Sequence, residues 1–365
     1  MGYRVIHVGT SLETRGGISA VLKVILGGSE EKLSHIVTHC DGSVLKRIMT
    51  FMRGWIALVR SLLSGAPAIY HIHSASYGSW ARKSICVLTV RLFRRPMILH
   101  MHGGGFKKFY ETKVGPLGRV CVRGILRSAD AIIVLSPEWA EFFKELAPRV
   151  AVVVIPNAVA IPPRLDEAHW SGTHAWRIAC LGRLWERKGT WDLLRAFAQL
   201  EQSAELSLAG DGEIERARSL AQELGVAERV KLLGWIDAET RAQVLSEAHI
   251  FALPSYVEGL PMALLEAMSY GLPVISTPVG GIPTLIKHGV NGILIEPGDV
   301  ISLQQALRHL MTNPNEAVRL GAAARRTIEE RYDAAVFRAS LHKLHADLAQ
   351  ARCADSRGLA RAKLS

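Results

Sequence analysis

Two glutamates, Glu258 and Glu266, flank a short segment with the features of a pyrophosphate-binding site. The segment follows a strand-like run, residues 249–253, and leads into an apolar stretch with helical spacing. That stretch stops at Gly271 and Pro273, two residues that end helices. The pattern therefore predicts Glu258 in a loop and Glu266 in the helix that follows it.

The entrance to this predicted helix suits an anion. Backbone N–H groups around Gly259 and Leu260, with Pro261 just inside the helix, would give it a positive end. A carboxylate on either side could then hold sugar or ribose hydroxyls. The alternative interpretation is a surface glutamate and a glutamate that caps the helix.

A second cluster lies upstream, where Arg183 and Lys188 flank a turn between Gly182 and Gly189. The turn follows another strand-like run, residues 177–181. Two cations placed around one turn are what a doubly charged leaving phosphate needs.

Together, the Gly-Arg and Arg-Lys-Gly of residues 182–189, the Glu-x7-Glu of residues 258–266 and the Gly-x-Pro-Val of residues 271–274 resemble the retaining glycosyltransferases of family 4. The resemblance covers the C-terminal half of the chain closely and the N-terminal half loosely. It implies an α/β chain with the GT-B fold, in which two Rossmann-like domains with parallel sheets face a central cleft.

The resemblance also implies roles for individual residues. Arg183 and Lys188 would stabilise the leaving phosphate, Glu258 would hold sugar hydroxyls, Glu266 would hold the ribose, and His102 would contact the donor sugar. Further donor contacts are expected from Gly16, Gly17, Gly210, Trp235, Gly259 and Leu260. Gly16 and Gly17 do not form a G-x-G-x-x-G dinucleotide fingerprint, and read alone they indicate only a turn.

The rest of the chain supplies the elements that position these residues. Its 365 residues exceed the ~250 to 300 at which one core usually divides, so two domains are expected. Strand-like and helical patterns alternate, which predicts parallel β-α-β units with ligands at the carboxyl ends of the strands. We expect an acceptor domain over residues 1–162, a nucleotide-sugar domain over residues 163–335, and a helix crossing back to the first domain, with a tail, over residues 336–365.

Composition limits the class of protein. Five cysteines without a C-x-x-C pair argue for a reducing compartment and against a zinc knuckle. The N-terminal residues read as a strand and lack the pattern of a signal peptide. No run of ~18 apolar residues predicts a spanning helix. We therefore expect a cytoplasmic protein, peripheral on the inner face of the cytoplasmic membrane.

Charge is distributed unevenly. Residues 1–164 hold 22 Lys and Arg against 9 Asp and Glu, a balance of +13, whereas the whole chain carries +11. The basic stretches of residues 47–60 and 82–95, and Lys107-Lys108 beside Phe106, Phe109 and Tyr110, suggest an anionic membrane surface as a partner. No pattern typical of nucleic-acid binding accompanies them, so we expect no nucleic acid.

Two His-x-His pairs, His71 with His73 and His100 with His102, could place imidazoles on one face of a strand, as a metal site requires. No carboxylate or cysteine lies near them in sequence, and GT-B enzymes generally work without a metal ion. We expect no metal and no cofactor beyond the nucleotide sugar.

The sequence thus predicts a bacterial, retaining glycosyltransferase. It would move a sugar from a UDP- or GDP-linked donor to a lipid-linked or growing polysaccharide acceptor, in exopolysaccharide, capsule or lipopolysaccharide synthesis. A non-catalytic sugar-nucleotide sensor and a sugar-nucleotide epimerase on the same fold are the alternatives. The sugar, the nucleotide and the choice between same-face attack and double displacement stay open.

Overall fold

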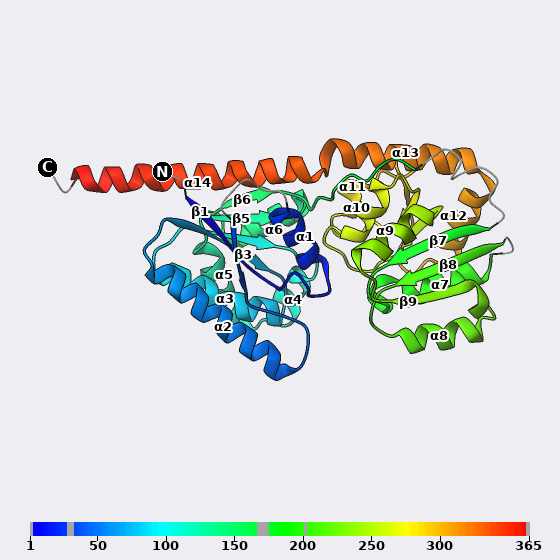
Figure 1. Ribbon diagram of the computed structural model, residues 1–365, viewed down its shortest axis with the longest axis horizontal. Coiled ribbons are helices and arrows are strands. Elements are labelled where there is room, and N and C mark those ends of the chain that lie inside the picture. The colour runs from blue at the N-terminus through cyan, green and yellow to red at the C-terminus, as the bar shows by residue number, and fades with distance from the viewer. Residues whose placement is uncertain (1–2, 28–32, 166–174, 201–202, 363–365) are drawn as a thin grey trace. The chain divides into compact units, whose positions relative to one another are not determined.

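A computed structural model describes residues 3–27, 33–165, 175–200 and 203–362 of the chain (Figure 1). The chain forms two compact units, residues 1–157 with 334–365, and residues 158–333. Each unit has a single six-stranded sheet and its own layers of helices.

The sheet of the first unit is parallel and has the strand order β2-β1-β3-β4-β5-β6. Its strands are β1 (Arg4–Gly9), β2 (Leu33–Val37), β3 (Ala68–Ser74), β4 (Met97–Met101), β5 (Ala131–Val134) and β6 (Ala151–Val154). In this register His7 lies opposite His71, and His73 lies opposite His100.

Helices connect and cover these strands, as right-handed parallel units require. They are α1 (Gly17–Leu26), α2 (Val44–Leu63), α3 (Gly78–Leu92), α4 (Phe106–Thr112), α5 (Pro116–Arg127), α6 (Pro137–Leu146) and α14 (Ala334–Ala362). The last helix belongs to the first unit although it follows the second unit in sequence, and it packs with α1. It extends to Ala362.

The sheet of the second unit is also parallel, with the order β12-β11-β10-β7-β8-β9. Its strands are β7 (Trp176–Leu181), β8 (Ala204–Ala209), β9 (Val230–Gly234), β10 (Ile250–Leu253), β11 (Val274–Ser276) and β12 (Ile293–Leu294). Its helices are α7 (Thr190–Ala198), α8 (Ile214–Glu223), α9 (Ala238–Glu247), α10 (Met262–Ser269), α11 (Ile282–Leu285), α12 (Val300–Thr312) and α13 (Pro314–Arg331), with 3-10 turns over Glu186–Lys188 and Ala227–Arg229.

The two faces of the first sheet differ in chemistry because side chains alternate along a strand. Ile6, Val8 and Ile72 point into an apolar core that α2, α3, α5 and α6 cover. The residues between them, His7, His71 and His73, point to the opposite face and are fully buried there. A buried layer of imidazoles therefore lies on one side of the sheet and an aliphatic core on the other.

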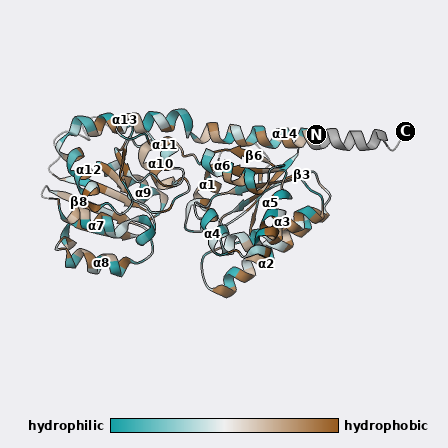
Figure 2. Ribbon diagram, turned by 180° about the vertical axis from the view of Figure 1, so that it is seen from behind, coloured by the Kyte–Doolittle hydropathy of each residue, from teal (hydrophilic) through white to brown (hydrophobic). Residues whose placement is uncertain are grey.

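Figure 2 shows hydrophobic residues, in brown, along the length of α2 in addition to those in the interior. None of the helices among the described residues combines the length and the apolar character needed to cross a membrane.

Candidate functional site

The second unit has a topological switch point between β7 and β10. From β7 the chain proceeds to β8 on one side, and it later enters β10 on the other side of β7. The loops after β7 and β10 therefore leave the same edge of the sheet in opposite directions, which is where parallel α/β sheets bind ligands. These two loops carry Arg183, Lys188 and Glu258, three of the predicted catalytic residues.

An ion pair joins the two loops. Lys188 Nζ lies 2.5 Å from Glu258 Oε1, and Ser255 Oγ donates to the same oxygen at 2.9 Å. The exposed fractions of the two charged side chains are only 22% and 10%. The sequence placed both residues at the site but did not predict that they contact each other.

Glycines at two positions let the loops approach each other. Gly189 has a φ of +69°, and a Cβ there would lie 2.0 Å from the carbonyl oxygen of Pro254. Gly210, at the end of β8, has a φ of +156°, and a Cβ would lie 1.9 Å from the oxygen of Gly182. Any larger residue would therefore force the loops apart. The end of β8 therefore lies close to the loop after β7, at the same edge of the sheet.

Arg183 is exposed, and no carboxylate in the described part of the chain forms an ion pair with it. Its guanidinium carbon lies 5.1 Å from the centre of the Trp185 ring, and that of Arg187 lies 5.0 Å from the same ring. Stacking on an indole costs a guanidinium none of its hydrogen-bond donors. The donors of Arg183 are thus available to an anion at the loop after β7.

Glu266 lies in α10 as predicted, and Arg241 of α9 binds it with Nη1 2.7 Å from Oε1. Burial raises the pKa of Glu266, and the Arg241 charge opposes that rise. The sequence analysis missed Arg241 because no motif marks it. Pro261 is the residue before the helix rather than the first residue inside it.

The turn after β11 supports the Glu258 loop, and the sequence analysis missed it too. Gly281 N–H donates to the Gly259 oxygen at 2.5 Å. Gly280 has a φ of +57°, and a Cβ there would lie 2.0 Å from the Glu258 oxygen. The Gly-Gly pair after a strand was the available signal, since it allows the close approach of two backbones.

The remaining predicted donor contacts of this unit lie at the same edge of the sheet. Trp235 follows β9 and is 45% exposed, while Leu260 is buried beside α10. The Gly210 N–H donates to the oxygen of Gly234 at 2.7 Å, which ties the end of β8 to the end of β9.

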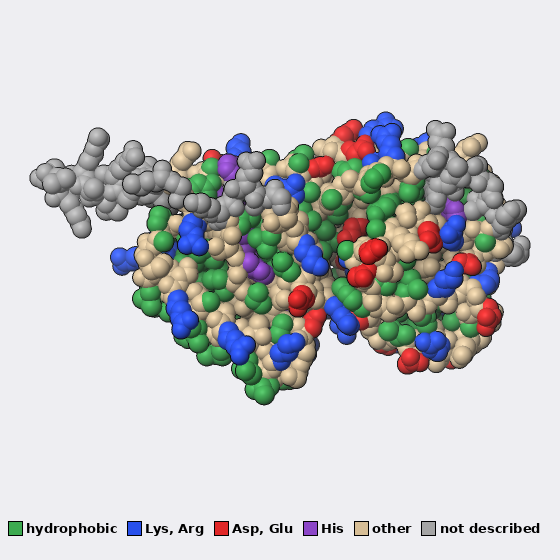
Figure 3. Space-filling view, viewed as in Figure 1, with side chains coloured by type: hydrophobic (Ala, Val, Ile, Leu, Met, Phe, Trp, Pro, Cys, Tyr) green, Lys and Arg blue, Asp and Glu red, His purple; other side chains and the backbone are tan. Residues whose placement is uncertain are grey.

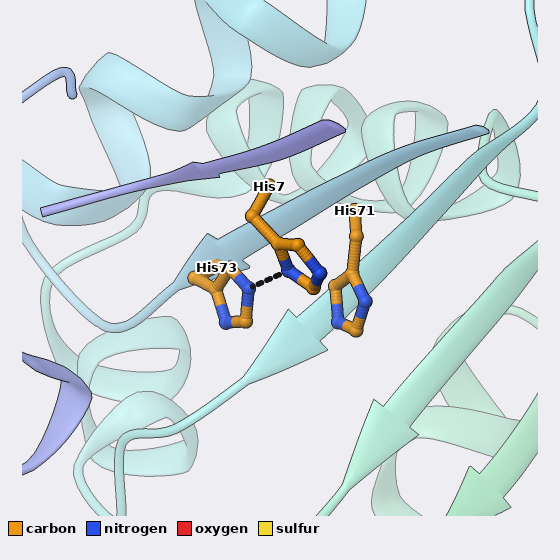
Figure 4. A group of neighbouring side chains, drawn as sticks. All are labelled: His7, His71 and His73. Atoms are coloured by element: carbon orange, nitrogen blue, oxygen red, sulfur yellow. Dashed lines mark hydrogen bonds between the residues drawn. The ribbon is translucent and has the colours of Figure 1, made fainter. Parts of the chain in front are cut away.

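The first unit contains His102, the fourth predicted catalytic residue, directly after β4. Its Nε2 lies 2.8 Å from His73 Nδ1, and His73 Nε2 lies 3.0 Å from His7 Nδ1. Figure 4 shows the bond between His7 and His73, with the ring of His71 beside them. Three imidazoles from three segments thus form one hydrogen-bonded chain.

A second chain runs alongside the first. His71 of β3 joins His345 of α14 at 3.1 Å and His100 of β4 at 3.1 Å. Burial lowers the pKa values of His7, His71, His73 and His100 well below the usual value, and it lowers that of His102 to about 3. We therefore treat these rings as neutral near pH 7.

Two trios of these histidines bring nitrogen atoms within 4.8 Å of one another, His7 with His71 and His73, and His73 with His100 and His102. Metal–nitrogen bonds lie in the plane of an imidazole. The rings of His71 and His73 are stacked with only 5° between their planes, and those of His100 and His102 are stacked at 27°. Stacked rings do not point at a common ion, so this geometry suits a hydrogen-bonded array better than a metal centre.

Gly16 and Gly17 lie where the loop after β1 enters α1. Gly16 precedes the helix with a φ of +137°, Gly17 is its first residue, and a Cβ at either would meet no atom within 4 Å. Both residues are exposed. An open helix start of this kind is available to an anion, but no further feature of the structure assigns one to it.

Two details of the predicted basic surface are wrong. Phe106 and Tyr110 are buried, because they are one helical turn apart on α4 and face the apolar core. Lys83, a residue of α3, is also buried. These residues are therefore not part of an exposed surface beside Lys107 and Lys108.

Two family models match the chain. Residues 175–313 match the model "Glycosyl transferases group 1", and residues 40–158 match the model "Glycosyl transferase 4-like domain". The amylovoran biosynthesis glycosyltransferase AmsK of Erwinia amylovora is 37% identical over 167 residues, which are 43% of this chain and 41% of the relative. The matched segments cover between 40% and 64% of the length of the curated relatives.

Solved structures share the fold over nearly the whole chain. Sucrose-phosphate synthase from Thermosynechococcus elongatus superposes with a TM-score of 0.78 at 20% identity, covering 96% of this chain and all of that one. HepE of Anabaena in complex with UDP gives 0.77 at 18% identity, covering 94% of this chain and all of that one. At these identities the likeness establishes the fold alone.

Proposed function

Because the chain belongs to the group 1 glycosyltransferases and has the GT-B fold, we propose that it transfers a sugar from a nucleoside diphosphate sugar to an acceptor. In this proposal the second unit binds the donor and the first unit binds the acceptor. The ion pair between Lys188 and Glu258 at the switch point carries the proposal, because it places a cation for phosphate beside a carboxylate for hydroxyl groups.

The proposed reaction breaks the bond between the anomeric carbon and the β-phosphate oxygen. Negative charge then grows on that phosphate, and Lys188 and Arg183 stabilise it more in the transition state than in the ground state. The acceptor oxygen forms the new bond to the anomeric carbon, and its proton passes to the departing phosphate oxygen. This attack on the same face retains the anomeric configuration without a protein nucleophile.

Glu258 and Glu266 divide the remaining work in the proposal. Glu258 accepts hydrogen bonds from the sugar, and Lys188 and Ser255 hold it in place through Oε1. Glu266 accepts from the ribose, and Arg241 orients it. Two cations at the phosphate serve the purpose that a metal ion serves elsewhere, so we propose transfer without a metal.

Release of nucleoside diphosphate tests the function. The full chain is incubated with UDP-glucose, UDP-galactose, UDP-N-acetylglucosamine or GDP-mannose, with and without a polyprenyl-diphosphate-linked sugar. We expect one donor to release its nucleoside diphosphate slowly alone and faster with acceptor. A saturating nucleotide should also raise the thermal stability, by ~2.7 kcal/mol at 100-fold its Kd. If no donor releases its nucleoside diphosphate and no nucleotide stabilises the protein, the proposed function is wrong.

The same assay separates the two alternatives. A sensor would be stabilised by its nucleotide but would release none, and an epimerase would interconvert donor sugars with no release. Retention is tested separately, since nuclear magnetic resonance of the product shows whether its anomeric configuration matches that of the donor.

For the first unit, we propose docking on an anionic bilayer through α2. Seven apolar side chains on this helix are between 42% and 69% exposed, namely Val44, Leu45, Ile48, Met49, Met52, Ile56 and Leu63. Lys46, Arg47, Arg53 and Arg60 alternate with them. Figure 3 shows hydrophobic side chains with Lys and Arg among them along the edge of the first unit where Figure 1 labels α2.

An apolar face bordered by cations is typical of helices that lie in the headgroup region of a membrane. Each Lys or Arg near an anionic surface adds about 1 kcal/mol of attraction. This placement fits a lipid-linked acceptor, such as the intermediates of exopolysaccharide, capsule or lipopolysaccharide synthesis. We further propose that the protein acts at the inner face of a bacterial cytoplasmic membrane, where nucleotide sugars are present.

A further inference from the structure

Lys83 is a buried amine, and burial lowers its pKa to about 8, so it is still mostly charged at pH 7. It lies on α3, is 3% exposed, and donates from Nζ to Thr38 Oγ1. The Thr38 hydroxyl in turn donates to the Gly9 oxygen at 2.9 Å. Among the residues the structure describes, no carboxylate forms an ion pair with Lys83, and Thr38 is its single hydrogen-bond partner. Two of the three ammonium N–H groups are therefore free to bind another acceptor.

Arg82, the preceding residue, adds a second charge without a counterion. Its Nε is buried and has no hydrogen-bond partner in the described part of the chain, and no described carboxylate pairs with its guanidinium. A buried guanidinium N–H without an acceptor is costly, and an ionised group raises that cost. Arg82 and Lys83 occupy consecutive positions of one helix, so their positive charges also repel each other.

The surroundings of these two cations are positive as well. Arg47, at the start of α2, lies close enough for its charge to lower the pKa values of both His39 and Arg82. His39 Nδ1 is buried without a partner among the described residues. Asp41 is the acid that faces this group, and its Oδ2 already accepts the Arg15 N–H at 2.8 Å. His39 thus lies near the charges of Arg82, Arg47 and Lys83, and Asp41 is the one carboxylate among the described residues that raises its pKa.

The place of this cluster in the fold is one where ligands bind. Thr38 follows β2, and its N–H also donates to the oxygen of Gly9 at 2.8 Å, at the end of β1. Both ends lie at the carboxyl edge of the parallel sheet. The cations on α3 thus converge on the same edge as the loop that leads into α1.

We propose that Arg82, Lys83 and the Thr38-His39 segment form an anion subsite that holds a phosphate or diphosphate group of the acceptor, an inference that rests on the acceptor role proposed for the first unit. A phosphate offers three or more acceptor oxygens and up to two negative charges, which match the two unneutralised cations. A guanidinium binds such a group through two parallel hydrogen bonds. A carboxylate would supply one charge and leave the cluster positive.

The phosphate could belong to a lipid diphosphate or be free inorganic phosphate, and the test separates the two. Binding of inorganic pyrophosphate and of phosphate is measured by calorimetry on the full chain. The chain carries the Arg183→Ala and Lys188→Ala changes, so that the second unit does not bind the probe. In this background we test Arg82→Gln and Lys83→Met. The matched controls are Arg127→Gln and Lys144→Met, which change exposed cations of the same unit.

We expect pyrophosphate to bind the background protein and both controls, and Arg82→Gln and Lys83→Met each to weaken it at least tenfold. Lys83→Met should also raise the melting temperature without ligand, because it removes an uncompensated buried charge. That rise shows that the variant folds. If all variants bind pyrophosphate equally well, or if the background protein does not bind it, the proposed subsite is wrong.

The assignment to the acceptor is tested in the enzyme with Arg183 and Lys188 intact. Arg82→Gln should raise KM for a diphosphate-linked acceptor tenfold or more, and leave KM for an uncharged alkyl glycoside acceptor and for the donor unchanged. Equal effects on both acceptors would show that the subsite binds free phosphate instead. If no donor is turned over but pyrophosphate binding still depends on Arg82 and Lys83, the proposed function fails and the anion subsite stands.

Discussion

Lys188 and Glu258 meet across the switch point of the second sheet, with Nζ 2.5 Å from Oε1 although 70 residues separate them. A cation and an anion in contact on two different loops are held by the geometry of the sheet rather than by local sequence. When a donor binds, each of them can exchange part of this contact for a ligand atom of opposite charge. The pair thus keeps both groups in place without leaving either charge uncompensated.

Lys188→Ala and Arg183→Ala should each lower kcat by ~10²- to 10³-fold, because each removes a donor aimed at charge that grows in the transition state. The melting temperature should change by only a few degrees, since both side chains reach solvent. Arg177→Ala is the matched control, because Arg177 lies on β7, the strand that precedes this loop, and pairs with Glu247 on the surface. A kcat near the parent value in both variants would show that Lys188 and Arg183 do not stabilise the leaving phosphate.

Glu258→Gln and Glu266→Gln should separate sugar binding from nucleotide binding. Glu258→Gln keeps an oxygen for Lys188 and Ser255 but loses the negative charge. It should therefore weaken binding of the donor sugar and leave binding of the nucleoside diphosphate nearly unchanged. Glu266→Gln removes the charge that Arg241 binds, and it should weaken binding of the nucleotide itself. Calorimetry with the nucleotide and with its sugar measures both. An equal loss of nucleotide binding in the two variants would contradict the division.

The sequence predicted the parts of this site that are contiguous. Glu258 lies in a loop and Glu266 in a helix, as the stop at Gly271 and Pro273 indicated. Arg183 and Lys188 flank a turn that follows a strand. Such features depend on local periodicity and on turn residues, which a single sequence displays directly.

Contacts between distant segments could not be predicted in this way. Arg241 reaches Glu266 from a different helix, and His71 meets His345 across 274 residues. Lys83 was expected on a basic surface, but only the packing of α3 against the sheet shows that it is buried. Phe106 and Tyr110 are different, because their spacing of four residues was a visible sign of a buried helix face.

Replacing Ile48 and Met52 of α2 by serine should reduce binding to anionic vesicles. Both side chains are more than 40% exposed, so the change should cost little stability while removing apolar area from the membrane contact. Co-sedimentation with vesicles of phosphatidylglycerol and of phosphatidylcholine, at low and high salt, measures the effect. Ile301→Ser, a 65% exposed position in the second unit, is the control.

We expect the parent and the control to bind anionic vesicles at low salt and to release them at high salt, because salt screens exposed charges. An additional variant in which Arg94, Arg95, Lys107 and Lys108 are changed to serine measures the contribution of cations outside α2. If the parent does not bind anionic vesicles, or if the variant with Ile48 and Met52 changed to serine binds them equally well, α2 is not the membrane contact.

The histidine array should make the first unit sensitive to acid. Burial lowers the pKa values of His7, His71, His73, His100 and His102 in the folded protein, whereas the unfolded value is about 6.5. Below pH 6.5 the unfolded chain therefore binds protons that the folded chain does not. Stability is fully present above this pH and is lost as the pH falls toward the folded values.

Each histidine that stays neutral in the folded protein lowers its stability by up to about 1.4 kcal/mol per pH unit below 6.5. Because a domain is stable by only about 5–15 kcal/mol, the first unit should lose stability measurably as the pH falls below 6.5. Hydrogen exchange of the β3 and β4 amides from pH 8 to 5 measures this loss in the first unit alone. His7→Gln should make the dependence on pH shallower by about one proton, and His309→Gln, an exposed position in the second unit, should leave it unchanged. If the stability of the parent falls with pH with a slope of only one proton or fewer, the histidine array accepts protons while the protein is folded.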